Sequence, residues 1–443
     1  MDTPIIDFVR KYSDLGTHRF HMPGHKGREL IGIEAYDITE ISGADSLYEA
    51  DGIIRESEQN ASLLFGADTY YSTEGSSQCI RAMIYLALMD AKGKGLSPRI
   101  LACRNAHKTF ISAISLLDAE TDWHMGMGDS YLSCPIDFDT LETELKDGGY
   151  TAFYVSSPDY LGNIQNIGRI ADICHRYGVM LLVDNAHGAY LRFLTPSLHP
   201  IDLGADIVCD SAHKTLPAIT GAAYLHISKK CVGVSRSTVK EALALFGSTS
   251  PSYLILQSLD ALNAYIADGY GTRLSALIDR VRILRGKLTD NGYVLIGNEE
   301  IKLTIDARAY GYYGYEIADI LRREHSVECE FADTDYIVLM LSTENGEGEI
   351  EDLCKALISI ERKAEIIDTP PAIFKAKRVL STREATLSPF DTVPVEKAEG
   401  KILAQSSASC PPAVPIVVPG ELICADAIKA FKYYGISECK VVK

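Results

Sequence analysis

Short apolar runs alternate with amphipathic stretches from about residue 60 to residue 290. The runs are almost continuously hydrophobic, as in strands buried on both faces of a parallel sheet. They include 99–103, 152–156, 179–183 and 207–209. Between them, the spacing of apolar residues predicts helices over 78–91 and 167–177, and Gly178 follows the second helix as a C-cap. This alternation predicts an α/β domain with a mainly parallel sheet.

A smaller set of elements begins near residue 290. The pattern predicts strands at 292–297, 302–305 and 336–341 and helices at 315–324 and 348–362. We therefore expect a large domain followed by a smaller α+β domain.

Four regions follow from this organisation. They are an N-terminal arm (1–60), a large domain (61–290), a small α+β domain (291–368) and a C-terminal extension or subdomain (369–443). Thr369-Pro370-Pro371 reads as the linker into the extension. The proline-rich run Cys410–Pro419 excludes regular structure, because proline removes an N–H donor and fixes φ.

The composition is that of a globular protein with an acidic balance. Of the 443 residues, 47% are hydrophobic and 23% charged, and 43 Lys and Arg against 60 Asp and Glu give a net charge of −17. Such a chain repels phosphate backbones and anionic lipid, so we expect neither nucleic acid nor a membrane as a partner. No apolar run approaches the roughly 18 residues of a membrane span. The first residues lack signal-peptide features, and the 11 cysteines include no Cys-x-x-Cys pair, which favours a reducing cytoplasm.

Two predicted strand ends carry residues suited to chemistry. Asp184 closes the strand 179–183, and Ser211-Ala212-His213-Lys214 follows the strand 207–209. A desolvated lysine amine can lose its proton and form Schiff bases, and a carboxylate at a strand end can pair with a protonated ring nitrogen. The structural alternatives are a surface lysine and an aspartate that caps a helix. A separation of thirty residues, about one strand–helix–strand step, favours neighbouring strand ends that share one site.

The segment Thr73-Glu74-Gly75-Ser76-Ser77 opens the predicted helix 78–91. Backbone N–H groups and small hydroxyls at a helix N-terminus bind anions, although a plain serine N-cap is the alternative. No Gly-Lys-Ser/Thr follows, so the segment is not a Walker loop.

Histidines supply two further signals. His107 follows the strand 99–103, where an imidazole could stack on an aromatic cofactor or act as a satisfied polar group. His21 and His25 are four apart, but Pro23-Gly24 breaks any helix that would align them on a metal, so we predict no metal site. We expect a structured loop there, near a phosphate or a subunit boundary.

An anion-binding helix start, a strand-end aspartate and a strand-end lysine, in this order, predict a pyridoxal-phosphate site. The sequence resembles the prokaryotic ornithine/lysine/arginine decarboxylases of the fold-type I pyridoxal-phosphate superfamily, in its short form without an N-terminal wing domain. The blocks that carry the resemblance run almost from end to end: 21–27, 37–41, 104–108, 183–188, 211–217, 250–253, 411–415 and 419–421.

The resemblance implies a role for each site residue. Lys214 would hold the cofactor as a Schiff base, Asp184 would keep its ring nitrogen protonated, and His107 and Ala186 would pack on the two ring faces. Further cofactor contacts would come from Gly75, Ser76, Ser77, His187, Ser211 and His213, with Ser248 or Thr249 reaching across from a partner subunit. The active unit would be a homodimer or a larger even assembly. Lys214 or His213 would return a proton to Cα.

Three departures from the family pattern concern loops that shape the substrate pocket. Gly221 stands where the family usually has Gln, Ser46-Leu47-Tyr48 where it often has Asp-Leu-His, and Pro411-Pro412-Ala413 where it has Pro-Pro-Gly. The substrate therefore stays open among arginine, lysine and ornithine, with the amine product feeding polyamine synthesis. Glu421 is the candidate partner of the substrate's distal cation. Its structural alternative is a helix N-terminal position ahead of 422–430.

Two other functions compete with decarboxylation. Transamination or β-elimination uses the same cofactor, but an aminotransferase needs an arginine for the substrate carboxylate, and only Arg362 and Arg378 are candidates. A non-catalytic pyridoxal-phosphate-binding paralogue is the other alternative, and the joint presence of Lys214, Asp184 and His107 argues against it.

Overall fold

The computed structural model describes residues 1–128, 130–231, 233–368, 370–406 and 412–443. Predictions that fall on Thr369, Cys410 and Pro411 lie outside the described residues. The chain divides into two compact units, one formed by 1–97 with 167–274 and the other by 98–166 with 275–443, and each is described by itself.

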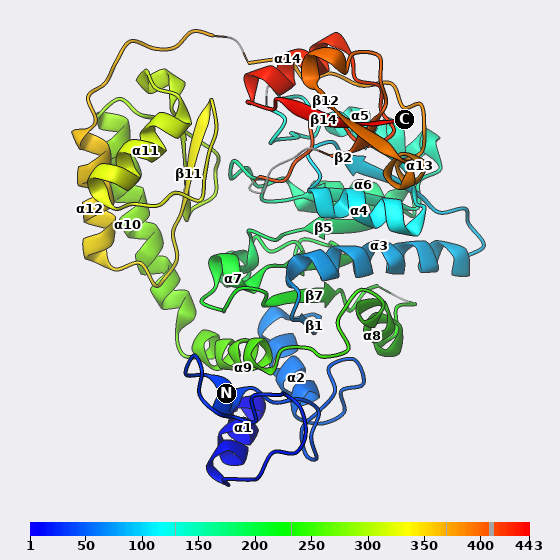
Figure 1. Cartoon of the computed structure of the whole chain (residues 1–443), viewed down its shortest axis with the longest axis vertical. Coiled ribbons are helices and arrows are strands. Elements are labelled where there is room, and N and C mark those ends of the chain that lie inside the picture. Colours follow the sequence, from blue (N-terminus) through cyan, green and yellow to red (C-terminus); the bar gives the residue numbers. More distant parts are fainter. Residues whose placement is uncertain (129, 232, 369, 407–411) are drawn as a thin grey trace. The chain divides into compact units, whose positions relative to one another are not determined.

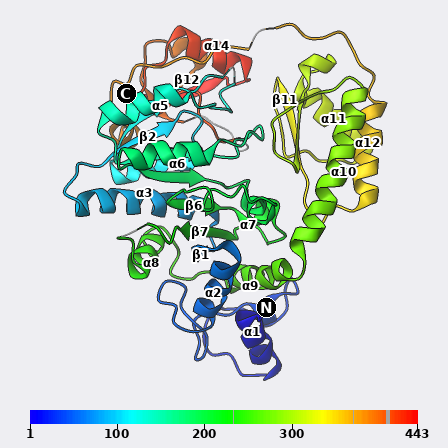
Figure 2. The same ribbon diagram turned by 180° about the vertical axis from the view of Figure 1, so that it is seen from behind.

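The first unit carries strands β1, β5, β6 and β7 of the predicted large domain (Figure 1). Its elements are α1 (Pro4–Asp14), η1 (Glu34–Tyr36), α2 (Ile53–Phe65), β1 (Asp68–Ser72), α3 (Gly75–Gly93), α6 (Ile167–Arg176), β5 (Met180–Asp184), η2 (Ala189–Phe193), β6 (Ile207–Asp210), α7 (Ala212–Thr215), β7 (Ala223–Ile227), α8 (Arg236–Ala244) and α9 (Tyr253–Ala267). Strands β5 and β6 are parallel, whereas β7 runs antiparallel to both β6 and β1. Helix α3 packs on β6 and β7 and alongside α8 (Figure 2).

The second unit contains the remaining elements. They are β2 (Arg99–Cys103), α4 (Lys108–Leu117), β3 (Glu120–His124), α5 (Phe138–Gly148), β4 (Ala152–Ser156), α10 (Tyr270–Asp290, which starts in the first unit), β8 (Val294–Ile296), β9 (Lys302–Asp306), η3 (Arg308–Tyr310), α11 (Gly314–His325), β10 (Phe331–Ala332), β11 (Tyr336–Met340), α12 (Glu347–Ser359), α13 (Thr382–Leu387), β12 (Phe390–Pro394), η4 (Val395–Lys397), β13 (Leu403–Gln405), α14 (Ala425–Tyr433) and β14 (Glu438–Val442).

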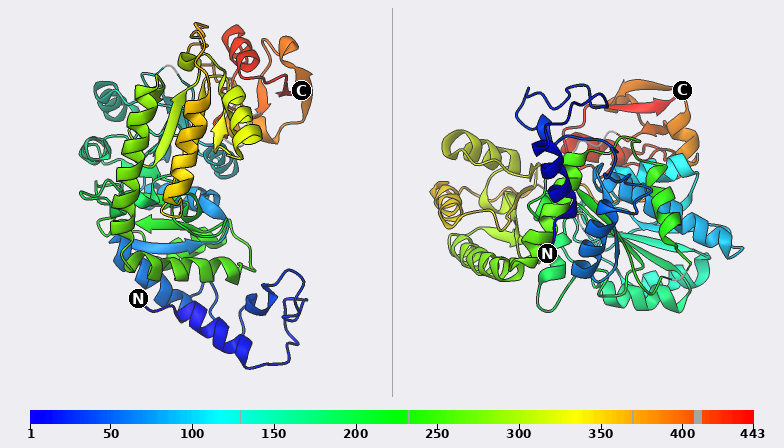
Figure 3. Two further views of the ribbon diagram at one scale, coloured as in Figure 1. Left: turned by 90° about the vertical axis from the view of Figure 1, so that its left-hand side faces the viewer. Right: turned by 90° about the horizontal axis from the view of Figure 1, so that it is seen from below.

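The strands listed above form three sheets. The large sheet has the order β1-β7-β6-β5-β4-β2-β3, and β2 is parallel to both β3 and β4. An antiparallel sheet of order β10-β11-β9-β8 has helices α10, α11 and α12 on one face (Figures 1 and 3). The third sheet, β12-β14-β13, belongs to the C-terminal region.

The predicted fold class is confirmed. The four apolar runs form β2, β4, β5 and β6, and the two amphipathic stretches form α3 and α6. The buried strands are hydrophobic on both faces, as parallel strands between helix layers must be. The antiparallel edge formed by β7 and β1 was not among the predicted elements.

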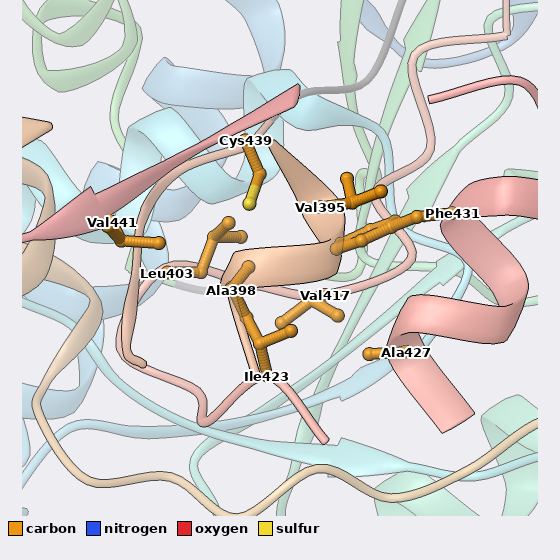
Figure 4. Close-up of a cluster of buried hydrophobic side chains, with 9 residues drawn as sticks. All are labelled: Val395, Ala398, Leu403, Val417, Ile423, Ala427, Phe431, Cys439 and Val441. Atoms are coloured by element: carbon orange, nitrogen blue, oxygen red, sulfur yellow. The ribbon is translucent and has the colours of Figure 1, made fainter. Parts of the chain in front are cut away.

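The C-terminal region has its own apolar core (Figure 4). Strands β13 and β14, η4, α14 and the segments beside them contribute buried side chains to it: Val395, Ala398, Leu403, Val417, Ile423, Ala427, Phe431, Cys439 and Val441. Helix α14 begins at Ala425 after the N-cap Cys424, so the predicted helix start at residue 422 is wrong. The four predicted region boundaries stay a prediction.

None of the helices in the described part of the chain is both long and apolar enough to span a membrane.

Candidate active site

The carboxyl ends of β5 and β6 lie side by side in the first unit. Asp184 ends β5 and pairs in register with Cys209 of β6. The Asp184 side chain is buried, and its Oδ1 accepts hydrogen bonds from the Ala186 N–H at 3.2 Å and the Cys209 thiol at 3.5 Å. The sharp turn after β5 thereby fixes the carboxylate at the edge of the sheet where α/β folds bind ligands.

Lys214 lies on the single helical turn α7, directly after β6. Ser211 is the N-cap residue of this turn, and the half-buried Lys214 amine lies 2.9 Å from His187 Nε2. His187 follows Asp184 by three residues, so the loop after β5 and the turn after β6 meet at one point. Sequence spacing predicted that Asp184 and Lys214 share neighbouring strand ends, and the parallel pairing of β5 with β6 confirms it.

A buried hydrogen-bond network holds the loop after β5 and the turn after β6 in place. Asp210, the last residue of β6, accepts from His199 Nε2 at 3.0 Å, His226 Nε2 at 3.1 Å and the Asn185 amide at 2.7 Å. Asp210, His199 and His226 are fully buried. Burial raises the pKa of the Asp210 carboxyl, but His199 and His226 outweigh that effect and hold the pKa well below its usual range. Sequence reasoning missed this network, and the position of Asp210 directly before Ser211 was the available signal.

The same three side chains could be taken for metal ligands, since their donor atoms lie within 4.8 Å of one another. The Ile201 N–H donates to His199 Nδ1 at 3.4 Å, so that ring carries its proton on Nε2, which donates to Asp210. A ring nitrogen that carries a proton has no lone pair for a metal. The geometry is therefore that of a positioning network.

The N-terminus of α3, called the cradle below, lies in the same unit and has features that suit an anion. The N-cap residue Glu74 makes no side-chain capping bond, and Gly75 adopts φ +69° with open space where a Cβ would stand. Ser76 and Ser77 follow at half-buried positions. The buried Ser211 hydroxyl has no hydrogen-bond partner among the described residues. A helix start without a side-chain cap and an unsatisfied hydroxyl suit a phosphate, and the Lys214 amine and Asp184 carboxylate suit the aldehyde and ring nitrogen of pyridoxal.

Gly221 explains one departure from the family pattern. Its carbonyl accepts from the Gly75 N–H at 2.8 Å, and its φ is +98°. A Cβ at Gly221 would lie 2.9 Å from Ile255 Cδ1 and 3.2 Å from the Thr73 carbonyl oxygen. Glycine allows the backbone at residue 221 to support the cradle directly, which a glutamine in this conformation would not.

Tyr48, a second departure, also lies beside the start of α3. Its hydroxyl accepts from the Gln78 amide at 2.7 Å, and the Ser72 hydroxyl donates to Gln78 Oε1 at 2.5 Å. The same amide donates to the Leu243 carbonyl at 2.8 Å. The first turn of α3 is thus held by three segments, and Tyr48 belongs to the Ser46-Leu47-Tyr48 loop that the sequence singled out as a departure from the family pattern.

The other predicted phosphate contacts lie near this cradle. Ser248 and Thr249 are exposed, and the Ser248 N–H donates to the Glu74 carboxylate. His213 Nδ1 donates to the Ala222 carbonyl at 3.0 Å. The predicted contact of Ser248 or Thr249 with a partner subunit stays a prediction.

His107 belongs to the second unit, where it is the N-cap residue of α4. Its Nδ1 accepts from the Thr109 N–H at 3.1 Å, and its ring is half-buried. Its predicted stacking on the cofactor stays a prediction.

Glu421 occupies a different environment from the two that the sequence suggested. It precedes α14 by four residues and is 4% exposed. Its backbone forms an isolated antiparallel β-bridge with Arg378. Its carboxylate accepts from the Val418 N–H at 2.7 Å and faces Arg104 at 3.5 Å. The helix N-terminal alternative is wrong. The predicted contact to the substrate's cation receives no support, because the carboxylate already faces a buried guanidinium.

The two arginines considered for a substrate carboxylate have other contacts. Arg378 donates to the Thr121 carbonyl at 2.6 Å and pairs with Asp122 at 3.5 Å. The Arg362 guanidinium lies against Gly292. Neither guanidinium is arranged like an arginine that binds a substrate carboxylate.

The histidine-rich opening is a structured loop, as expected. His25 Nε2 lies 3.1 Å from Asp37, the Gly27 N–H donates to His25 Nδ1 at 2.9 Å, and His21 Nε2 lies 2.8 Å from the Tyr12 hydroxyl. These contacts account for the loop's order without assigning it a ligand.

Comparison with known proteins identifies the family of this chain. The major domain of the Orn/Lys/Arg decarboxylases matches residues 3–303, and the C-terminal domain of the same family matches residues 372–439. An uncharacterized protein of Bacillus subtilis, YaaO, is 30% identical over 97% of this chain and 93% of its own length. An arginine decarboxylase of Halalkalibacterium halodurans is also 30% identical, over 95% of this chain and 91% of its own.

Solved structures confirm the fold. The lysine decarboxylase LdcF of Francisella novicida superposes with a TM-score of 0.79 at 17% identity and covers 100% of this chain and 81% of its own. The constitutive lysine decarboxylase of Escherichia coli gives 0.77 at 16% identity, with 100% and 82% covered.

Fold and site therefore define a pyridoxal-phosphate-dependent decarboxylase of fold type I. The chain belongs to the Orn/Lys/Arg decarboxylase family. Its cofactor is pyridoxal phosphate.

Proposed function

We propose that the protein decarboxylates arginine to its amine, with lysine and ornithine as the alternative substrates. The observation that carries the proposal is the meeting of Lys214 and His187 at 2.9 Å beside the Asp184 strand end. Arginine is placed first because relatives named arginine decarboxylase align over nearly the whole chain at 27–30% identity. The lysine decarboxylase structures are only 16–17% identical and support the fold alone.

Residues from several segments of this chain would hold the cofactor. Lys214 would bind its aldehyde, Asp184 would face its ring nitrogen, and Ala186 and His107 would contact the ring. Gly75, Ser76, Ser77, Ser211 and His213 would bind the phosphate, and Ser248 or Thr249 would add a contact from the partner subunit. The unpartnered Ser211 hydroxyl and the lack of a side-chain cap from Glu74 at the start of α3 support this assignment.

The bound cofactor supplies an electron sink for the pair left on Cα when carbon dioxide departs. Asp184 keeps that sink effective, because a buried carboxylate favours the protonated form of a ring nitrogen beside it. The Asp210 network holds Asn185, and hence the Asp184 turn, in place.

Lys214 or His213 would return the proton to Cα. The Lys214 amine is positioned by His187, which can accept or supply a proton at 2.9 Å. The hydrogen bond from His213 Nδ1 to the Ala222 carbonyl would orient the His213 ring for this role.

The setting of this activity follows from the same proposal. The amine product would feed polyamine synthesis, the enzyme would act in the cytoplasm, and a homodimer would be its smallest active form. The acidic net charge of −17 suits a cationic substrate, because it does not repel it.

The test is a product assay with the purified holoenzyme. Arginine, lysine and ornithine are each supplied at equal concentration, and carbon dioxide and the corresponding amine are both quantified. The proposal expects equal amounts of carbon dioxide and amine with arginine as the best substrate. A keto acid product in place of carbon dioxide would contradict it, as would a clear preference for a non-basic amino acid.

A further inference from the structure

An open pocket lies beside β1, the edge strand of the large sheet, in the first unit. Its volume is about 530 Å³, which is within the range of small-molecule sites. Helix α2 and strand β1 pack together and line it, and the first residue of α8 completes it (Figure 1). Asp68 begins β1, whereas the cradle follows its last residue, Ser72. The pocket and the cradle share no residue of the described chain.

A buried ion pair lies against the pocket. Glu58 of α2 is 4% exposed, and its carboxylate lies 2.5 Å from Lys240 Nζ and accepts from the Tyr71 N–H at 3.0 Å. Its second oxygen faces Arg236 at 3.6 Å. Because donors already surround Glu58, this carboxylate is not available to a cationic ligand.

A tyrosine hydroxyl lines the pocket without a partner. Tyr70 of β1 is 6% exposed, yet its hydroxyl makes no hydrogen bond to any residue that the structure describes. Polar atoms of buried side chains are normally hydrogen-bonded. Burial, reinforced by Asp68 and Glu58, raises the pKa of Tyr70, so the phenol keeps its proton and can donate it. The pocket therefore contains an O–H donor for which the described chain supplies no acceptor.

Two arginines add positive charge to the same pocket. Arg55 is exposed on α2, and its guanidinium makes no hydrogen bond or ion pair within the described ranges. Arg236 begins α8, and its Nη2 donates to the Ala50 carbonyl at 2.8 Å, which orients the guanidinium. Guanidinium groups and a phenol hydroxyl in one pocket are the donors that suit a carboxylate.

Asp68 decides which class of ligand fits the pocket. Its carboxylate is exposed at the start of β1 and lines the pocket, with no ion pair to another described residue. A simple anion would be repelled by Asp68, and a simple cation would be repelled by the two arginines. A ligand that carries both a carboxylate and an ammonium group satisfies both signs of charge.

We infer that this pocket binds a free α-amino acid in its zwitterionic form. The carboxylate of the ligand binds the two guanidinium groups, of Arg55 and Arg236, and the Tyr70 hydroxyl. Its ammonium group binds Asp68. This site goes beyond the proposed decarboxylation, because it uses none of the residues assigned to that reaction and breaks no bond of its ligand.

The first test is calorimetric titration of the holoenzyme after reduction with borohydride. The reduced cofactor stays on its lysine and forms no Schiff base with an added amino acid, so binding elsewhere is measured. Each protein amino acid is titrated in turn. We expect at least one to bind, and Arg55→Gln to weaken that binding by at least ~10-fold. Failure of every amino acid to bind, or binding that Arg55→Gln leaves unchanged, overturns the inference.

Two further variants separate the roles of the polar groups. Tyr70→Phe removes an oxygen that bonds to no described residue, so the fold should persist while amino-acid binding weakens by ~10-fold. Asp68→Asn should weaken binding of the amino acid and leave binding of its deaminated acid unchanged. Arg10→Gln, which removes an exposed guanidinium on α1, is the matched control and should bind as the wild type does. Wild-type affinity in Tyr70→Phe and Asp68→Asn would contradict the assignment.

Analogues of the best-binding amino acid test its zwitterionic form. The acid that lacks the amino group, the amine that lacks the carboxylate, and inorganic phosphate are titrated under the same conditions. Each should bind at least ~10-fold more weakly than the amino acid, because each lacks one of the two charged groups. An acid or phosphate that binds as tightly as the amino acid would overturn the choice of ligand. Turnover enters none of these measurements, so their outcome is separate from that of the decarboxylation assay.

Discussion

Arg104 and Glu421 are 317 positions apart in the sequence, and their side chains meet at 3.5 Å inside the second unit. Their side chains are 12% and 6% exposed. Arg104 also donates to the carbonyls of Pro415 and Ile416 at 2.9 and 2.7 Å. The ion pair therefore connects the segment after β2, which contains His107, to the proline-rich segment before α14.

The first prediction concerns the removal of this pair's negative charge. Burial raises the pKa of Glu421, and Arg104 opposes that rise. Glu421→Gln would leave the buried guanidinium without its counter-charge and should reduce the free energy of unfolding by about 1–3 kcal/mol, measured by urea denaturation. KM for arginine, lysine and ornithine should stay unchanged.

The control for this variant is Glu396→Gln. Glu396 pairs with Lys432 at 3.5 Å, and both side chains are more than half exposed, so its loss should have little effect on stability. If Glu421→Gln instead raised KM for a cationic substrate without loss of stability, Glu421 would return to the role of a substrate contact.

The second prediction concerns Ala413, the third departure from the family pattern. Ala413 is buried and adopts φ +56°, a left-handed conformation that favours glycine. Its carbonyl accepts from the Lys108 N–H at 2.7 Å, so the conformation is held in place. Ala413→Gly should stabilise the protein by up to about 1 kcal/mol, because relief of backbone strain exceeds the added chain entropy.

A buried alanine of ordinary conformation provides the comparison. Ala398 has φ −93°, so Ala398→Gly should destabilise by about 0.5–1 kcal/mol. Loss of stability of similar size in both variants would show that residue 413 is not strained.

The third prediction concerns pH and Asp333. Burial, reinforced by Asp335, raises the pKa of the Asp333 carboxyl to about 7, although the Tyr336 N–H opposes the rise. Because the folded state holds this proton more tightly than the unfolded chain does, its stabilising effect is present below about pH 4 and is lost as pH rises to about 7. Asp333→Asn should remove that slope and be more stable than the wild type at pH 8.

Chemical denaturation at several pH values between 4 and 8 measures the slope. Asp352→Asn, which changes an exposed carboxylate paired with Lys355, should leave the slope as it is in the wild type. An unchanged pH dependence in Asp333→Asn would show that this carboxyl titrates normally.

Local patterns were enough to predict strands β2, β4, β5 and β6 and the neighbouring strand-end positions of Asp184 and Lys214. Apolar runs that are hydrophobic on both faces identified β5 and β6, and the residues after them, Asp184 and Lys214, followed from the rule that parallel strands end together. The partners of Asp210 could not be predicted, because His199 and His226 reach it through strand pairing and loop folding. The contact of Glu421 with Arg104 could not be predicted for the same reason, because Arg104 lies in a distant segment of the sequence.

The fourth prediction tests the shared site. Ser248→Asp would place a negative charge beside the cofactor phosphate and should inactivate the enzyme, as should Lys214→Ala. If Ser248 acts across a dimer, mixing and refolding the two inactive variants should restore activity, because each mixed dimer has one intact site. Absence of rescue, or a fully active monomer in sedimentation at assay concentration, would contradict the proposal.

The most direct test of the central claim is the identification of the lysine that holds the cofactor. The holoenzyme is reduced with borohydride, digested, and the peptide carrying the pyridoxyl group is sequenced by mass spectrometry. The account predicts a single modified residue, Lys214, and a Lys214→Ala variant that takes up no label and loses at least ~10²-fold in turnover. A pyridoxyl group on any other lysine would contradict it.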